Sequence, residues 1–252
     1  MTRDEPAPHP CVIATIGLHG SGSTWAFNVA RELAGRAGGG APVSGYADAL
    51  GELPPGAEDA TVWRVLKSHH GSAGMDRWLE DVGARYLLTL RDPRDAALSM
   101  RGRFGIGLGD AVRIVFNDCR RLHGVMARRE HFLLRYESGF FRDAGTVAAV
   151  AAWLGVDAAE WEAIALRYTP EATRAFAAGI AALPADRIGD RGAGGGRFDR
   201  LTNIHDVHIG DMRRGKWRDL PEGVQAEMTG IFREYLEVFG YGAGEAPSIG
   251  SR

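Results

Sequence analysis

Lysine, cysteine and long apolar runs are scarce in this sequence of 252 residues. Lysine occurs only as Lys67 and Lys216 among 30 basic residues, so each marks a place where a compact ammonium group does what a planar guanidinium cannot. Cysteine occurs only as Cys11 and Cys119, which predicts reduced, buried thiols in a cytoplasmic protein. No apolar run approaches the roughly 20 residues of a membrane-spanning helix, so we expect no membrane span.

Net charge is also nearly absent, since 30 basic and 32 acidic side chains leave −2 at pH 7. A chain without a strong overall field is not expected to bind nucleic acid, and any polyanion site must come from a local basic cluster. Residues 1–10 are polar, acidic and proline-rich, unlike a signal peptide. We expect one domain over 1–252 with flexible ends at 1–10 and 242–252. The sequence indicates no oligomeric state.

Hydrophobic periodicity predicts an α/β fold. Strand-like apolar runs, each followed by a turn signal or a helical pattern, occupy 11–17, 61–68, 84–91 and 131–137. Helical patterns occupy 24–35, 72–82, 93–102 and 109–129, and after about residue 143 the pattern is helical almost throughout. Strands that alternate with helices imply a central parallel sheet flanked by helices, followed here by a helix-rich C-terminal half.

Two segments, 36–59 and 185–211, are glycine-rich and poor in periodic structure. Loops of this length inside a compact domain are usually functional lids or disordered segments. The second segment leads directly into a basic cluster, so a lid and a linker both remain open there, and we favour the lid.

The stretch GLHGSGSTW, residues 17–25, joins the first predicted strand to the first predicted helix. Such a glycine-rich turn points backbone N–H groups and the positive end of the helix dipole at one spot, which suits a phosphate. The Walker pattern G-x-x-x-x-G-K-[ST] is matched at Gly17, Gly22 and Thr24, but Ser23 occupies the place of its lysine. We predict an anion-binding loop in preference to a plain capped turn. Trp25 fits either a core position or a platform for a base.

A second candidate stretch, RVLKSHHGS, ends the next predicted strand with Lys67, His69 and His70. Ligands of open α/β sheets bind outside the carboxyl ends of the strands, so these side chains should face the same crevice as the loop. A histidine there can take a hydroxyl proton, and a lysine can neutralise charge on a transferring group. The alternative is a pair of histidines on an ordinary surface loop.

A third stretch runs from Arg91 to Ser99. Asp92 followed by Pro93 is a strong helix start, with a capping carboxylate and a proline at the first helical position. Ser99 returns to the cap's side of the helix two turns later, so one anion could meet both Arg91 and Ser99. The alternative is a structural ion pair between Arg91 and Asp95.

A fourth stretch, 208–221, gathers basic side chains around Gly215 and Trp217. Its charges could fold over a bound polyanion, although a charge run is more often a solvated face. His205 and His208 lie beside it, and we expect structural or surface roles for them and no metal site, because neither a cysteine nor a third close histidine completes one. The basic residues are Arg213, Arg214, Lys216 and Arg218.

In this order the four stretches resemble the PAPS-dependent sulfotransferase family over roughly residues 11–220, which implies a P-loop nucleoside-kinase-like fold. The family's loop P-K-S-G-T-T-W also lacks the Walker lysine and is similar to HGSGSTW. Its K-T-H element resembles Lys67-Ser68-His69, and its R-x-P-x-D-x-x-x-S element resembles 91–99. Its apolar strand ending in Tyr-Glu resembles FLLRYES. Its last element, R-K-G-x-x-G-D-W, is matched only by GKW at 215–217, so Arg213 and Arg214 would have to substitute for its Arg-Lys pair.

The resemblance implies that the protein moves a sulfuryl group from PAPS, 3'-phosphoadenosine 5'-phosphosulfate, to a hydroxyl of a small-molecule acceptor without a metal. His69 would be the catalytic base and Lys67 would contact the sulfuryl group. The family's loop lysine aligns with Gly20, so either Lys67 alone or Lys67 with His19 would carry that charge. The implied PAPS-binding residues are Gly20, Ser21, Gly22, Ser23, Thr24, Trp25, Arg91, Ser99, Tyr136, Arg213, Arg214, Gly215 and Lys216.

Two alternatives remain at this point. A P-loop kinase would use Asp92 as a Mg²⁺ ligand, but it would lack the lysine that reaches the β- and γ-phosphates. A non-catalytic nucleotide-binding protein would keep the phosphate cradle without the reaction. Gly20 favours the second alternative, whereas Lys67 and His69 argue against it.

Overall fold

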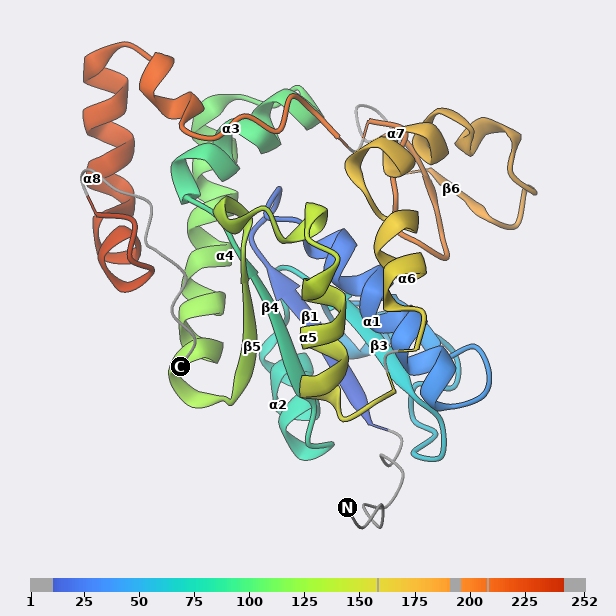
Figure 1. The fold of residues 1–252 in the computed structure, drawn as a ribbon. Coiled ribbons are helices and arrows are strands. Elements are labelled where there is room, and N and C mark those ends of the chain that lie inside the picture. Colours follow the sequence, from blue (N-terminus) through green and yellow to red (C-terminus); the bar gives the residue numbers. More distant parts are fainter. Residues whose placement is uncertain (1–10, 158, 191–195, 208, 243–252) are drawn as a thin grey trace.

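The computed structural model describes residues 11–157, 159–190, 196–207 and 209–242. The expected flexible ends, apart from Gly242, and His208 lie outside these residues. A five-stranded sheet, all of whose pairings are parallel, forms the centre of the molecule in the order β2-β3-β1-β4-β5 (Figure 1). Its strands are β1 (Val12–Gly17), β2 (Val43–Tyr46), β3 (Arg64–Ser68), β4 (Arg85–Leu90) and β5 (His131–Arg135).

Helices cover both faces of this sheet, as the unbroken apolar strands require. The helices are α1 (Ser23–Ala37), α2 (Ala73–Asp81), α3 (Pro93–Phe104), α4 (Leu108–Arg128), α5 (Gly145–Leu154), α6 (Trp161–Arg167), α7 (Pro170–Ala178) and α8 (Glu222–Val238), with single 3-10 turns at Leu50–Glu52, Tyr136–Ser138, Phe140–Arg142, Ile180–Ala182 and Lys216–Asp219. Side chains of β1 alternate between two core clusters: Ile16 belongs to the cluster with α2, α3, α4 and α8, whereas Ile13 belongs to the cluster with α1, α5 and α6. The predicted α/β class is therefore confirmed.

The helix start expected at Asp92 is confirmed. The Asp92 side chain accepts a hydrogen bond from the backbone N–H of Arg94, and Pro93 is the first residue of α3. This start fixes the direction in which α3 leaves the end of β4, and thereby the direction in which Ser99 points.

The prediction of structure-poor segments is wrong in part. The first segment contains β2, whose backbone pairs with β3 from Val43 opposite Arg64 to Tyr46 opposite Lys67. Because β2 is a half-buried edge strand of only four residues, no apolar alternation marks it in the sequence. The second segment contains a small antiparallel hairpin of β6 (Ile188–Asp190) and β7 (Arg197–Asp199).

Both thiols are free, with Cys119 buried and Cys11 half-buried. Burial raises the pKa of Cys11 to about 11, so this thiol is protonated at neutral pH. None of the described helices has both the length and the apolarity to cross a bilayer.

Candidate active site

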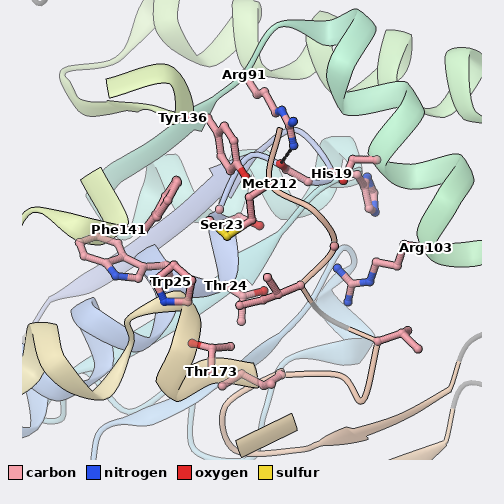
Figure 2. A pocket seen from close by; sticks show the side chains of 18 of the residues that line it. His19, Ser23, Thr24, Trp25, Arg91, Arg103, Tyr136, Phe141, Thr173 and Met212 are labelled. Carbon is pink, nitrogen blue, oxygen red and sulfur yellow. Dashed lines mark hydrogen bonds between the residues drawn. The ribbon is translucent and has the colours of Figure 1, made fainter. Parts of the chain in front are cut away.

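The loop after β1 and the carboxyl ends of β3 and β4 meet at one edge of the sheet, around a cavity of about 420 Å³ (Figure 2). Lys67, His69 and Arg91 reach it from the ends of β3 and β4. The residues predicted for the site that line the cavity are Gly20, Gly22, Ser23, Thr24, Trp25, Lys67, His69, Arg91, Ser99, Tyr136 and Lys216. Ser21, Arg213, Arg214 and Gly215 are not among its lining residues.

The loop after β1 depends on glycine for its shape. Gly20 and Gly22 have φ angles of 76° and 90°, which side chains rarely adopt. A Cβ atom at Gly20 would also lie 2.9 Å from the Ser99 hydroxyl oxygen. A lysine at position 20 is therefore opposed by both the backbone conformation and α3. Ser21 holds the loop from behind, since its hydroxyl donates to the Leu18 carbonyl at 2.6 Å.

The N-terminus of α1 follows this loop directly. Gly22 precedes the helix without a capping side chain, and Ser23 and Thr24 of the first turn line the cavity. The first turn of α1, with its two hydroxyl side chains, therefore borders the cavity, which is the arrangement that suits a bound anion.

Lys67 and His69 lie beside this helix start. The Lys67 ammonium donates a hydrogen bond to the Thr24 hydroxyl at 2.8 Å. The Nδ1 atom of His69 lies 2.6 Å from the Gly17 carbonyl, which can only accept, so Nδ1 carries the hydrogen and Nε2 is left as a proton acceptor. Burial, with the neighbouring His19 and Lys67, lowers the pKa of His69 well below its usual range. His69 is thus a neutral base.

Asp48 holds the segment that carries His69, and sequence analysis missed it. One carboxylate oxygen accepts hydrogen bonds from the Ser68 hydroxyl at 2.5 Å and from the backbone N–H groups of residues 69, 70 and 71, the first of them at 2.9 Å. Tyr46 donates to the other oxygen. Asp48 follows β2, the strand that carries no sequence signal, so nothing in the sequence points to it.

Asp48 is expected to stabilise the fold in a pH-dependent way. Although burial opposes ionisation, hydrogen bonds from Ser68, Tyr46 and the backbone lower its pKa to about 2. Because the folded pKa is depressed, the stabilisation is complete above the unfolded pKa of about 4 and is lost as the pH falls towards about 2. Asp48→Asn should therefore lower the free energy of unfolding by about 2 kcal/mol at neutral pH and by much less in acid, as measured by urea denaturation.

The matched control for this prediction is Asp59→Asn, which removes an exposed carboxylate that bonds only to Thr61 nearby and should change little. Equal stability of the wild type and Asp48→Asn at neutral pH would show that the network does not stabilise the fold.

Arg91 joins the loop to the basic turn. Its guanidinium donates to the Gly20 carbonyl at 3.1 Å and to the Arg213 carbonyl at 2.9 Å, and its Nε has no hydrogen-bond partner among the described residues. The carboxylate of Asp95 is 4.0 Å away and accepts instead from the backbone N–H groups of Gly215 and Trp217. The ion pair considered from the sequence is thus a long one, and Asp95 mainly anchors the turn.

Aromatic side chains form one wall of the cavity. Trp25 and Phe141 lie together on one side in Figure 2, and Tyr136 stands above them under Arg91, whose guanidinium is 4.1 Å from the Tyr136 ring centre. Trp25 is both a core residue and a lining residue, so the core position is confirmed, whereas its use as a platform for a base stays a prediction. Such a wall suits a stacked nucleobase.

The basic turn contributes less to the cavity than its charge predicted. Arg213 pairs with Asp219, and more than half of its side chain is exposed. Lys216 lines the cavity while its ammonium donates to Asp211 at 2.9 Å. Arg103 is a lining residue that sequence analysis missed, although it lies one helical turn beyond Ser99 on α3 and could have been found by that spacing.

The second structure-poor segment ends over the cavity. Its lining residues are Ile204, Val207, Ile209, Gly210 and Asp211, followed by Met212. This position agrees with a functional segment more than with a linker. His205 stacks on Phe198 and is buried, in line with the structural role expected for it.

His19, His69 and Asp118 offer donor atoms that all lie within 4.8 Å of one another. The two rings are stacked, however, with centres 3.9 Å apart and an angle of 23° between their planes. A histidine ligand holds a metal in the plane of its ring, and two nearly parallel planes do not meet near these atoms. The Nδ1 atom of His19 instead lies 2.7 Å from Asp118, and that of His69 lies 2.6 Å from the Gly17 carbonyl, so both atoms are engaged in hydrogen bonds.

The chain matches no protein-family model and no curated protein. Among solved structures it is similar to mouse sulfotransferase SULT7A1 complexed with PAP, with a TM-score of 0.64 and 13% identity over 92% of this chain and 86% of that one. It is also similar to retinol dehydratase in complex with androsterone and inactive cofactor PAP, with a TM-score of 0.59 and 16% identity over 91% and 81% of the two chains. A second structure of retinol dehydratase, in a complex with retinol and PAP, is similar with a TM-score of 0.59 and 14% identity over 91% of this chain and 82% of that one.

The chain therefore has an α/β fold with a central parallel sheet and a P-loop-like strand-to-helix turn. More narrowly, its fold is that of the PAPS-dependent sulfotransferases.

Proposed function

We propose that this protein is a sulfotransferase that moves the sulfuryl group of PAPS to a hydroxyl of a small-molecule acceptor. The observation that carries the proposal is the hydrogen bond of 2.8 Å between the Lys67 ammonium and the Thr24 hydroxyl. In Walker P-loop enzymes the hydroxyl at this position holds Mg²⁺. Here a fixed ammonium lies in its place, which suits a metal-independent transfer between anionic groups.

The remaining lining residues fit a 3'-phosphorylated adenine nucleotide. The start of α1 and Lys67 suit the 5'-phosphosulfate, and the aromatic wall suits the adenine. Arg91 and Ser99, which lies across from Gly20, suit the 3'-phosphate that distinguishes PAPS from ATP. Lys216 lines the cavity from the basic turn.

The reaction then follows from the positions of Lys67 and His69. PAPS supplies an activated sulfur whose bond to the phosphate oxygen breaks as the acceptor oxygen attacks. His69 takes the acceptor's proton at Nε2 while its Nδ1–H stays on the Gly17 carbonyl. Lys67, with the backbone N–H groups of the loop, stabilises the charge that develops on the sulfuryl group and the leaving phosphate.

The acceptor is proposed to have an apolar body. The lining side chains from the second segment, among them Ile204, Val207 and Ile209, give the cavity a partly apolar wall. Androsterone and retinol, named in the retinol dehydratase complexes, are molecules of this kind.

Neither alternative fits as well. Asp92, the Mg²⁺ ligand that a kinase would need, has both carboxylate oxygens bonded to the Arg94 side chain, at 3.0 and 2.7 Å. A non-catalytic nucleotide-binding protein would not require a neutral histidine with a free acceptor nitrogen beside the phosphate cradle.

The direct test is incubation of the purified protein with PAPS that carries a radiolabelled sulfuryl group and a panel of hydroxylated acceptors, including steroid and retinoid alcohols. We expect the label to move to at least one acceptor in the presence of a metal chelator. If the nucleotide binds but no acceptor is labelled, the non-catalytic alternative takes its place.

A further inference from the structure

One face of α3 lines the cavity and carries the arginine that sequence analysis missed. The lining residues of this face are Leu98, Ser99, Gly102 and Arg103, which is the spacing of neighbours on one side of a helix. Ser99 lies against the loop after β1, since a Cβ atom at Gly20 would be 2.9 Å from its hydroxyl oxygen. Arg103 follows about 6 Å farther along the helix axis, at the usual rise per residue. It therefore lines a part of the cavity beyond the loop.

The Arg103 side chain points into the cavity. Figure 2 shows it extending from the side across from Trp25 and Phe141, and apart from Arg91. The residue is half-buried, so part of its side chain is already withdrawn from water. A guanidinium therefore faces the cavity on the side away from the aromatic wall.

Other residues already serve each part of PAPS in the proposed function. The start of α1 and Lys67 suit the 5'-phosphosulfate, Arg91 and Ser99 suit the 3'-phosphate, and the wall with Trp25 suits the adenine. Arg103 lies one helical turn beyond Ser99 and across from that wall. It is thus placed to meet the acceptor and not the nucleotide.

The charges around the cavity favour an acceptor that is itself an anion. Among the described residues, the lining includes four lysine or arginine side chains and one carboxylate, that of Asp211, which accepts from the Lys216 ammonium at 2.9 Å. An uncharged acceptor that covered Arg103 would take water from the guanidinium and give nothing back, which costs free energy. A carboxylate would replace that water with two parallel charge-assisted hydrogen bonds.

We propose that Arg103 binds a carboxylate of the acceptor, so that the acceptors are hydroxylated acids with an apolar body. The inference rests on the proposed sulfuryl transfer and names the acceptor class of that reaction. The acceptor oxygen bonds to sulfur, its proton moves to Nε2 of His69, and the phosphate oxygen leaves with the electron pair of its bond to sulfur. Arg103 takes part in none of these bond changes. It holds the far end of the acceptor and thereby selects the hydroxyl that reaches the sulfur.

Hydroxyphenyl-alkanoic acids with side chains of increasing length, each compared with its methyl ester, test this class. We expect kcat/KM for the best acid to exceed that for its ester by about 10- to 100-fold, the usual effect of hydrogen bonds to a charged group. In Arg103→Gln the acid and its ester should react equally well. Arg103→Glu should reverse the preference, in favour of the corresponding hydroxyphenyl-alkylamines. A merely structural role of Arg103 would not produce this reversal.

Arg101→Gln is the matched control, because Arg101 lies on the same helix but is exposed and is not a lining residue. This variant should keep the wild-type preference for acids. A preference for acids that survives in Arg103→Gln would overturn the proposal. Loss of affinity for adenosine 3',5'-bisphosphate in Arg103→Gln, with the preference for acids unchanged, would overturn it as well and assign Arg103 to the nucleotide.

A measurement independent of turnover separates this inference from the proposed function. The acids and their esters are titrated by calorimetry into protein saturated with adenosine 3',5'-bisphosphate. The acid should bind about tenfold tighter than its ester in the wild type and no tighter in Arg103→Gln. Equal binding of acid and ester by the wild type overturns the role of Arg103 even if sulfuryl transfer is found. Tighter binding of the acid without any transfer from PAPS counts against the proposed function instead.

Discussion

His69→Ala is expected to lower the rate of sulfuryl transfer by about a thousandfold, within the range found for the loss of a positioned general base. The affinity for adenosine 3',5'-bisphosphate should stay nearly the same, because in the proposed reaction His69 acts on the acceptor hydroxyl and not on the nucleotide. Steady-state kinetics and calorimetry on the same preparation measure the two effects.

His70→Ala is the control for this substitution, since His70 is the next residue, half exposed and outside the cavity lining. His69→Gln keeps a side chain of similar size and guards against a loss of folding. Because the pKa of His69 is far below its ordinary value, the wild-type rate should not fall as the pH drops from slightly alkaline to slightly acidic. Full activity in His69→Ala would exclude His69 as the base.

Arg91→Ala is expected to remove the preference for a 3'-phosphate. A charge-assisted hydrogen bond to a buried guanidinium contributes about 1.5–3 kcal/mol, so the affinity for adenosine 3',5'-bisphosphate should fall by about 100-fold. The affinity for adenosine 5'-monophosphate, which lacks that phosphate, should change much less. Calorimetric titration of both nucleotides gives the comparison.

Arg91 also connects the loop after β1 to the basic turn through hydrogen bonds. A purely structural role of this kind predicts a different result for Arg91→Ala than binding of the 3'-phosphate does. If Arg91 acts only through its hydrogen bonds to the carbonyls of Gly20 and Arg213, both nucleotides should lose the same factor. Arg91→Lys keeps the charge but not the planar fork, so it should recover only part of the preference. An equal loss for both nucleotides would contradict the assignment of Arg91 to the 3'-phosphate.

Local signals explain how much of the site could be predicted from the sequence. The loop after β1, the end of β3 and the start of α3 each carry their pattern within about ten residues, because strand ends, glycine turns and helix caps are set by neighbouring residues. The parallel sheet follows from the alternation of strands and helices. The residues predicted from these signals include Lys67, His69, Arg91 and Ser99, and all four line one cavity in the structure.

Contacts between distant parts of the chain could not be predicted in the same way. Asp118 is 99 positions from His19 and lies in the middle of an amphipathic helix, α4. From the sequence alone, a carboxylate in such a helix is expected to lie on the surface. Asp48 follows an edge strand that has no apolar alternation. The contribution of the basic turn to the site was overestimated, because its basic residues are adjacent in the sequence and their ion pairs are not visible there. In the structure Arg213 pairs with Asp219, and Lys216 pairs with Asp211.

Calorimetric titration of the wild-type protein with adenosine 3',5'-bisphosphate, and separately with ATP and Mg²⁺, tests the central claim most directly. The site described above predicts tight binding of the bisphosphate that needs no metal, and weak binding of ATP that Mg²⁺ does not strengthen. A preference for ATP with Mg²⁺, or equal affinity for nucleotides with and without the 3'-phosphate, would contradict the account and favour a kinase.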